Sequence, residues 1–288
     1  MSAIAYPGRI FHATDRSARC DRALARAGLL SSAWQSTLTV VHVLHPAEVE
    51  THAMPPLGKH EWHSAEPWNE TVRRRLVDEL AAEGLEAEVR VSIGDSADSL
   101  RETVDQAAAE LVVLGIAKDA AMARIQLGST VDNLVRHARV PVLSVRRRAK
   151  TRYAHVVVAT DFSAPALQAL RLAAHWFEGA HFTLFHAYST AAASLDGVLA
   201  DDTSRPRVEQ MCADHLAMAD LPPRVATSLE VLLEIGHPAA LLADYVRNTN
   251  ADLVVLGSRG RSGVARVLLG STAEQLLHHL DCDTLVIR

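Results

Sequence analysis

The 288-residue chain contains only three cysteines and 5% aromatic residues. Cys20, Cys212 and Cys282 lie far apart and form no CxxC pair, and an odd number in a chain of this length argues against a disulfide framework. No apolar run approaches the roughly 18 residues that a membrane-spanning helix needs. The segment from Met1 to Phe11 lacks the basic stretch and apolar core of a signal peptide. We therefore expect a cytoplasmic protein.

The sequence also has no excess of basic over acidic residues. The formal net charge is −5, so no overall positive field would attract nucleic acid. Hydrophobic residues make up 49% and charged residues 22%, a composition typical of globular domains. The sequence has no GxSxG nucleophile turn, no GxxxxGK[ST] loop and no HExxH zinc motif. It also lacks the HxGH and SGGxDS signatures of nucleotidyl transfer and ATP pyrophosphatases. Lacking a catalytic set, the sequence favours a binding and regulatory protein over an enzyme.

The sequence does contain an internal repeat, because four short motifs occur twice in the same order. Two offsets separate the copies, 142 residues (257 − 115) and, for the first motif, 146 residues (161 − 15). The change places four extra residues between the first and third strands of the first copy, and loops accommodate such insertions most easily. We infer a duplication, with a first domain at 1–148 and a second at 149–288. The paired motifs are Ala13–Asp15 with Ala159–Asp161, Ile93–Gly94 with Ile235–Gly236, Leu111–Gly115 with Leu253–Gly257, and Leu127–Thr130 with Leu269–Thr272.

Each copy alternates short β-branched runs with segments of helical periodicity. This alternation requires crossover connections, which produce a parallel sheet with helices on both faces. We expect two five-stranded, doubly wound α/β domains of the Rossmann-like or flavodoxin-like kind. Ligands of such sheets bind at the carboxyl ends of the strands, where the strand order reverses. In the second copy we predict strands at 155–159, 182–188, 229–235, 253–256 and 284–287, and the first copy repeats the pattern from Arg9–Ala13 to Val142–Val145.

Between the copies, residues 146–152 include five basic residues in seven. An isolated charge run usually keeps a linker extended and solvated, which is the interpretation that we favour. The alternative is an anion-binding or nucleic-acid-binding patch.

A glycine-containing stretch follows the fourth strand of the second copy and ends where a helix begins, as a phosphate-binding loop requires. Gly257 and Gly260 are expected to turn with positive φ and to let a ligand approach, and Gly270 to allow the same approach at the helix entry. Ser271 and Thr272 would place hydroxyls beside free backbone amides at the positive end of the helix dipole. Additional positive charge would come from Arg259, Arg261 and Arg266.

The spacing of Gly257, Gly260, Gly270 and Ser271 resembles a motif of the universal stress protein family. The ATP-binding members of that family carry G-x2-G-x9-G-[S/T]. The turn formed by Ala159, Thr160 and Asp161 is similar to the family's first strand-to-helix turn, where the aspartate lies near the adenine and ribose. The resemblance covers nearly the whole chain. It implies a tandem, ATP-binding stress-response protein with an unidentified protein partner. Independently of the resemblance, Asp161 could help to hold Mg²⁺ on the nucleotide, but no base or nucleophile accompanies it, so we expect at most slow ATP hydrolysis. It also implies a pseudo-dimer within the chain, with Val142–Val145 beside Thr284–Ile287, and homodimers remain an option.

The first copy departs from this pattern. The position that matches Gly260 is Lys118 (260 − 142), and Asp119 follows it. A lysine resists the backbone conformation that glycine accepts, and the carboxylate of Asp119 would repel phosphates. Lys118 could instead reach a phosphate as a point charge. We favour a degenerate first site and one intact site in the second copy.

Two other functions are compatible with the sequence. A nucleotide-independent scaffold of the same fold is the main alternative, and an enzyme acting on another ligand is a third. Fifteen histidines invite a metal interpretation, centred on His60 and His63 with Glu61 between them. Zinc needs three or four converging ligands, so we interpret these histidines as exposed loop residues and expect no metal site.

Overall fold

The computed structural model describes residues 4–53, 66–94, 96–116, 129–189, 204–258 and 270–288. Within these ranges, ten strands form one sheet in the order β3-β2-β1-β4-β5-β10-β9-β6-β7-β8, with five strands from each copy. Within each copy all neighbouring strands are parallel, as predicted. The strands are β1 (Arg9–Thr14), β2 (Thr37–Leu44), β3 (Glu88–Ile93), β4 (Leu111–Gly115), β5 (Val142–Val145), β6 (His155–Ala159), β7 (His181–Tyr188), β8 (Glu230–Ile235), β9 (Leu253–Gly257) and β10 (Asp283–Ile287).

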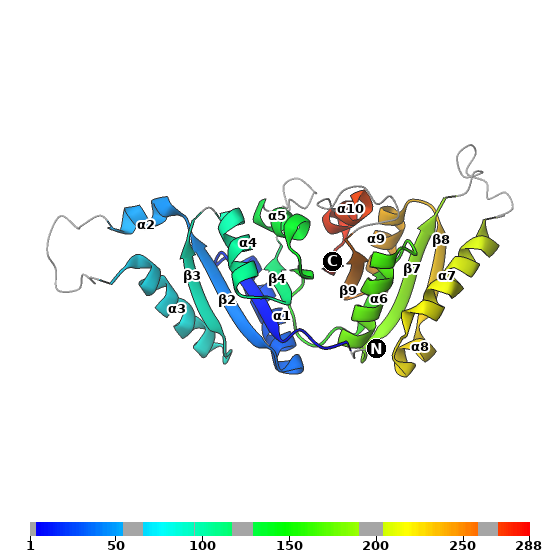
Figure 1. The fold of residues 1–288 in the computed structure, drawn as a ribbon, viewed down its shortest axis with the longest axis horizontal. Helices are drawn as coiled ribbons and strands as arrows, with labels where there is room; N and C mark the ends of the chain where they lie inside the picture. Colours follow the sequence, from blue (N-terminus) through cyan, green and yellow to red (C-terminus); the bar gives the residue numbers. More distant parts are fainter. Residues whose placement is uncertain (1–3, 54–65, 95, 117–128, 190–203, 259–269) are drawn as a thin grey trace.

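Helices cover both faces of this sheet (Figure 1). On one face, α1, α3, α6, α7 and α8 pack on a core that includes Ile10 and Val156. On the other, α4, α5, α9 and α10 pack on a core that includes Phe11 and Val157, as strand alternation requires. The helices are α1 (Ala18–Trp34), α2 (Pro46–Ala53), α3 (Trp68–Ala82), α4 (Ser96–Gln106), α5 (Ser129–His137), α6 (Ala164–Trp176), α7 (Arg205–Ala219), α8 (Pro223–Ser228), α9 (Pro238–Thr249) and α10 (Ser271–His279).

The two copies join along β5 and β10, which pair antiparallel with Thr284 opposite Ser144. Pairing buries two short apolar strands that would otherwise be exposed sheet edges. Two arginines repeat one contact across the seam: Arg146 donates to the carbonyl of Leu277, and Arg288 donates to the carbonyl of Val135. The predicted pseudo-dimer is therefore confirmed.

The expectation of a solvated linker is wrong at the first two residues of the segment between the copies, whereas Arg148, Lys150 and Arg152 are exposed. Arg146 is buried, and Arg147 donates to the carbonyls of Asp281 and Ala251 at 2.9 and 3.1 Å. The backbone amides of both arginines donate to Oδ1 of Asp283, at 2.8 and 3.1 Å. A charge count along the sequence could not reveal this, because the buried carboxylate lies 137 residues away from Arg146.

Oδ2 of the same Asp283 accepts the hydroxyl of Tyr153 at 2.7 Å and lies 3.5 Å from Nε of Arg26. Arg26 belongs to α1, so the first copy supplies a cation to a buried anion of the second. The side chains of Arg26 and Asp283 are 7% and 1% exposed.

Three local features depart from the sequence prediction. Part of the extra length of the first copy lies in a helix rather than in a loop: α1 has 17 residues against 13 in α6, about one additional turn. Helix α2 lies in the segment His45–Pro67, which its prolines and histidines indicate to be a loop, and α8 is a further helix that the sequence does not predict. Both are short, and six to eight residues carry too little periodicity to be recognised.

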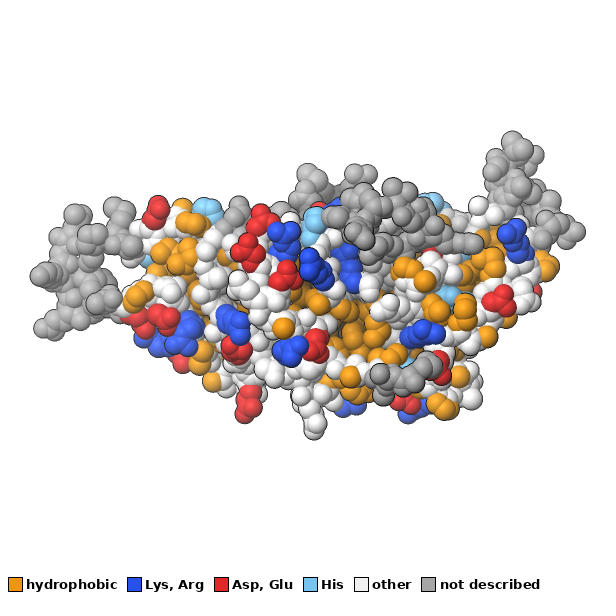
Figure 2. Space-filling model, in the orientation of Figure 1, with side chains coloured by type: hydrophobic (Ala, Val, Ile, Leu, Met, Phe, Trp, Pro, Cys, Tyr) orange, Lys and Arg blue, Asp and Glu red, His pale blue; other side chains and the backbone are white. Residues whose placement is uncertain are grey.

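The N-terminal segment also crosses to the second copy. The carbonyl of Ala5 accepts the indole N–H of Trp176 at 3.1 Å, and Tyr6 stacks on Trp34, which contacts Trp176 with ring centroids 5.7 Å apart. Charged side chains of both signs are interspersed over the first half of the molecule, whereas hydrophobic side chains gather where the halves meet (Figure 2). No helix in the described ranges is long and apolar enough to cross a membrane.

Candidate functional site

A cavity of about 190 Å³ opens in the second copy at the carboxyl ends of β6 and β9. The strand order reverses between these two strands, so the cavity occupies the position where doubly wound sheets bind ligands. Six of the predicted site residues line it: Ala159, Thr160, Asp161, Gly257, Gly270 and Thr272. The other lining residues are mainly apolar and come from α6, β7, β9, α9 and α10: Ala166, Phe185, Pro238, Leu242, Leu256, Ala273 and Leu276.

The turn between β6 and α6 holds Asp161 at the rim of this cavity. Phe162 adopts a left-handed conformation with φ 62°, which turns the chain sharply after the strand. Oδ1 of Asp161 accepts the amide of Ser163 at 3.0 Å, and Oγ1 of Thr160 accepts the amide of Phe162 at 2.9 Å. Ser163 then caps the helix by accepting the amide of Ala166 at 3.4 Å.

Gly257 has a different role from the one predicted. In the described part of the chain only Gly84 and Gly236 among the glycines have positive φ, so the expectation of positive φ at Gly257 is wrong. A Cβ at this position would lie 2.9 Å from the carbonyl carbon of Pro165 and 3.0 Å from the nitrogen of Ala166. The glycine therefore allows the end of β9 to approach the first turn of α6. Gly115 does the same in the first copy, where a Cβ would lie 2.5 Å from the carbonyl oxygen of Arg19.

Helix α10 begins at the cavity. Gly270 is its N-cap with φ −61° and ψ 143°, and its amide donates to the carbonyl of Ser258 at 3.1 Å. Thr272 in the first turn is exposed and lines the cavity. Unpaired backbone amides at such a helix start attract anions.

Several predicted residues lie outside the described ranges. These include Arg259, Gly260, Arg261 and Arg266 of the loop, and the side chain of Ser271. In the first copy they include Lys118, Asp119 and Gly128. His60, Glu61 and His63 also lie outside. The cysteines are all described, and Cys20, Cys212 and Cys282 are buried free thiols, as the absence of a disulfide framework predicted.

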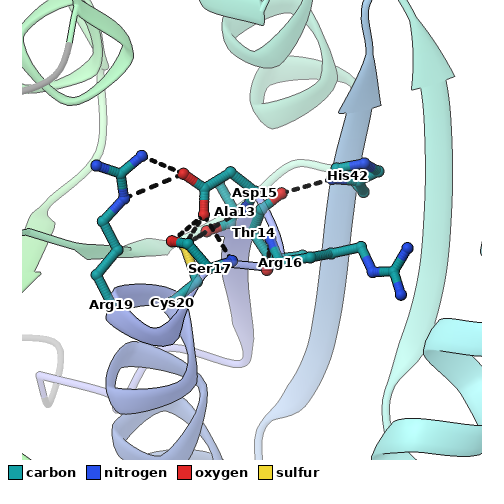
Figure 3. Close-up of polar contacts among 8 residues, drawn as sticks. All are labelled: Ala13, Thr14, Asp15, Arg16, Ser17, Arg19, Cys20 and His42. Atoms are coloured by element: carbon teal, nitrogen blue, oxygen red, sulfur yellow. Dashed lines mark hydrogen bonds and ion pairs between the residues drawn. The ribbon is translucent and has the colours of Figure 1, made fainter. Parts of the chain in front are cut away.

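The matching turn of the first copy places Asp15 in a dense set of contacts (Figure 3). Its carboxylate accepts the amide and the hydroxyl of Ser17, both Nε and Nη2 of Arg19, and the thiol of Cys20 at 3.1 Å. Partial burial acts to raise the pKa of Asp15, but the hydrogen bonds from Ser17, Arg19 and Cys20 outweigh it and hold this pKa well below its usual range. Burial raises the pKa of the Cys20 thiol, which stays protonated and donates.

The two turns share one backbone design but differ in these partners. Arg16 has φ 60°, like Phe162 in the second copy. At the offset of 146, Arg19 corresponds to Pro165 and Cys20 to Ala166, and neither replacement side chain can donate a hydrogen bond to Asp161. The carboxylate in the first copy is therefore tied to its own helix by side chains that the second copy lacks.

Histidines near both turns were not recognised from the sequence. Nδ1 of His42 lies 2.8 Å from the carbonyl oxygen of Thr14, and Nδ1 of His186 lies 2.7 Å from that of Thr160. Nε2 of His215 lies 3.2 Å from Oγ1 of Thr160, and burial lowers the pKa of His215. The equivalence of His42 and His186 in the repeat could have indicated the first pair, whereas nothing in the sequence places His215 on α7 near β6.

The residues described above occur twice, with the same strand order, the same turn and the same close approach at a glycine. The sequence model of the universal stress protein family matches residues 8–146 and again residues 152–288. The chain belongs to the universal stress protein family. Both halves are members, which confirms the predicted tandem arrangement.

Relatives agree with this assignment. A universal stress protein of Mycobacterium tuberculosis is 31% identical over 268 residues, which cover 87% of each chain. A universal stress protein of Synechocystis is 41% identical over 56 residues, covering 19% of this chain and 36% of the relative. Among solved structures, a universal stress protein from Archaeoglobus fulgidus has a TM-score of 0.68 over 98% of both chains at 19% identity, which supports the fold.

Proposed function

We propose that this universal stress protein is a cytoplasmic ATP-binding regulator, in which one nucleotide occupies the cavity of the second copy. The observation that carries the proposal is the cavity itself, because it combines apolar walls, a carboxylate and a helix N-terminus at the strand-order switch point. Membership of the family supports a role in the response to stress, and ATP occupancy would change the conformation or the partner affinity of the chain. The free buried thiols support a reducing compartment.

The size and lining of the cavity suit one part of ATP better than the whole molecule. A volume of about 190 Å³ is smaller than the roughly 300 Å³ or more of pockets that enclose entire drug-sized ligands. Phe185, Pro238 and Leu242 offer apolar surface for the base, and Asp161 can accept hydrogen bonds from ribose hydroxyls. The triphosphate would then extend towards Gly270 and the start of α10.

A companion Mg²⁺ ion fits the same arrangement. Mg²⁺ in nucleotide sites is held by one or two protein oxygens together with phosphate oxygens and water. Asp161 and the hydroxyl of Thr272 line the cavity and supply oxygen of the required kind. When bound, the ion would neutralise phosphate charge, while Asp161 and α10 would orient the nucleotide.

We also propose that only one of the two domains binds the nucleotide. The first domain, residues 1–148, would not hold a nucleotide, because Lys118 and Asp119 interrupt its loop and Arg19 and Cys20 engage its aspartate. The second domain, residues 149–288, would hold it. The competing function is a nucleotide-independent scaffold, which the continuous sheet formed by the two copies would also serve.

Equilibrium binding of ATP to matched variants tests the proposal. Gly260→Val should abolish binding, because a β-branched residue resists positive φ and blocks ligand approach. Lys118→Val changes the corresponding position of the first copy and should leave the affinity unchanged. Wild-type protein that fails to bind ATP would favour the scaffold, and equal affinity in the wild type and Gly260→Val would place the phosphates elsewhere.

A further inference from the structure

A second cavity, of about 190 Å³, lies at the seam between the copies and shares no residue with the ATP cavity. It is formed by Arg26 of α1, by residues 147, 148 and 150–152 of the connecting segment, and by Asp252 and Asp283. The two aspartates mark the amino ends of β9 and β10, whereas the ATP cavity opens at the carboxyl end of β9, roughly 13 Å along that strand. The seam cavity is therefore a separate place in the molecule.

The charge of this lining is strongly positive although the chain as a whole is acidic. Five cationic side chains and two carboxylates give a formal charge of 5 − 2 = +3, against −5 for the chain. Both carboxylates are already satisfied by the protein. Oδ2 of Asp252 accepts the amides of Ala154 and His155 at 2.8 and 3.0 Å, and Asp283 accepts the backbone amides and the Tyr153 hydroxyl described above.

The cationic side chains of this cavity differ in how many hydrogen bonds and ion pairs they form with the rest of the protein. Three of them, Arg148, Lys150 and Arg152, are exposed and form no hydrogen bond or ion pair within the described part of the chain. Arg26 is fixed beneath them: its Nη1 donates to the carbonyl of Thr151 at 2.8 Å, and its guanidinium lies 3.8 Å from the centre of the Tyr153 ring. Nε of Arg26 is buried without a hydrogen-bond partner in this part of the chain. A buried, hydrogen-bonded guanidinium and three exposed cations whose donors are unused in the described part of the chain thus line one cavity.

We propose that this seam cavity binds a compact oligophosphate, with the phosphate chain contacting Arg148, Lys150 and Arg152. Adjacent phosphates carry several charges in a small volume, and guanidinium and ammonium donors form their strongest hydrogen bonds with such oxygens. A monophosphate would engage too few of the cations, and a folded acidic protein would not enter a cavity of this size. An anion that binds only the folded chain would also stabilise it against unfolding.

Calorimetric titration of the full chain with inorganic tripolyphosphate, without Mg²⁺, tests this proposal. The triple variant Arg148→Ala, Lys150→Ala, Arg152→Ala should bind at least about tenfold more weakly, because each lost charge-assisted hydrogen bond contributes measurably to affinity. A matched triple variant, Arg73→Ala, Arg74→Ala, Arg75→Ala, removes the same charge from exposed positions of α3 and should retain wild-type affinity. Tripolyphosphate should also raise the melting temperature of the wild type but not of the seam variant.

Two further measurements keep this site distinct from the ATP cavity and from nucleic-acid binding. Tripolyphosphate affinity that is lost in Gly260→Val and retained in the seam variant would overturn the proposal, because the anion would then occupy the phosphate loop. The proposal would also be overturned if the seam variant bound a single-stranded RNA oligonucleotide more weakly than the wild type does but bound tripolyphosphate equally well. Equal tripolyphosphate affinity in the two triple variants would show only a general charge effect and would contradict it as well.

Discussion

The first and second copies have the same strand order and the same strand-to-helix turn, yet the aspartate of that turn has different side-chain contacts in the two copies. In the first copy, Asp15 is held by Arg19 and Cys20 from the following helix. In the second, Pro165 and Ala166 occupy those positions and Asp161 lines a cavity. The backbone of the turn is thus the same in the two copies, while Arg19 and Cys20 give Asp15 contacts that Asp161 does not receive from the equivalent positions.

A second difference lies at the seam. Asp283 and Arg26 form a buried charged contact, but their counterparts in the other copy are Pro141 (283 − 142) and Leu172 (26 + 146). One side of the pseudo-symmetric joint is therefore ionic and the other apolar. The duplication therefore accounts for the shared fold of the two copies, and differences at single positions account for their different contacts at the seam.

The largest effect on stability is expected at the buried contact between Asp283 and Arg26. Asp283→Ala removes the acceptor of two backbone amides and of Tyr153, and it leaves the buried Arg26 without its anion. Breaking a buried pair in this way costs about 3–5 kcal/mol. Urea denaturation should show a loss of that size, whereas Asp244→Ala, at an exposed ion pair, should lose less than about 1 kcal/mol. Equal losses would mean that the seam does not depend on this contact.

The next effect concerns His12, which occupies the position of Val158 in the second copy (12 + 146). His12 is buried, its Nδ1 lies 3.0 Å from the carbonyl oxygen of Val113, and burial lowers the pKa of His12 to about 4. Between pH 6.5 and 4 the unfolded chain binds a proton at this histidine and the folded chain does not. Stability is therefore lost as the pH falls through this window, by about 3 kcal/mol in total.

His12→Val makes the first copy resemble the second and should remove that part of the acid sensitivity. Stability measured by urea denaturation at pH 7 and pH 4.5 should fall less in the variant than in the wild type. His155 and His215, whose pKa values are also lowered by burial, remain and retain some pH dependence. Parallel losses in the two proteins would contradict the assignment to His12.

A smaller effect is expected at the first-copy turn. Arg19→Ala removes an ion pair whose side chains are 42% and 44% exposed, so the loss of stability should be less than about 1 kcal/mol. The pKa of Asp15 should nevertheless rise, because one of the groups that lower it is gone. NMR titration of the Asp15 carboxyl would measure this, with Arg73→Ala as the control. An unchanged pKa would mean that Arg19 does not engage the carboxylate in solution.

Much of the fold could be predicted from the sequence, because the repeat and the strand runs are local patterns. The pairing of β5 with β10 followed from the family resemblance and from the two apolar strands at the ends of the copies. What could not be predicted depends on contacts between distant residues. Asp283 gave no sign of its contacts with Arg26 and Tyr153, and the role of Gly257 depends on how closely α6 approaches β9. The engagement of Asp15 by Cys20 could have been suspected from their spacing of five residues across a turn.

The two copies are expected to differ in nucleotide binding. Calorimetric titration of the full chain with Mg²⁺ and ATP measures this difference, together with the matched variants Asp15→Ala and Asp161→Ala. We predict about one ATP per chain, an affinity that Asp15→Ala leaves unchanged, and a marked weakening in Asp161→Ala because the variant loses a charged acceptor in the cavity. Two equivalent ATP sites per chain, or equal effects of the two substitutions, would contradict the account.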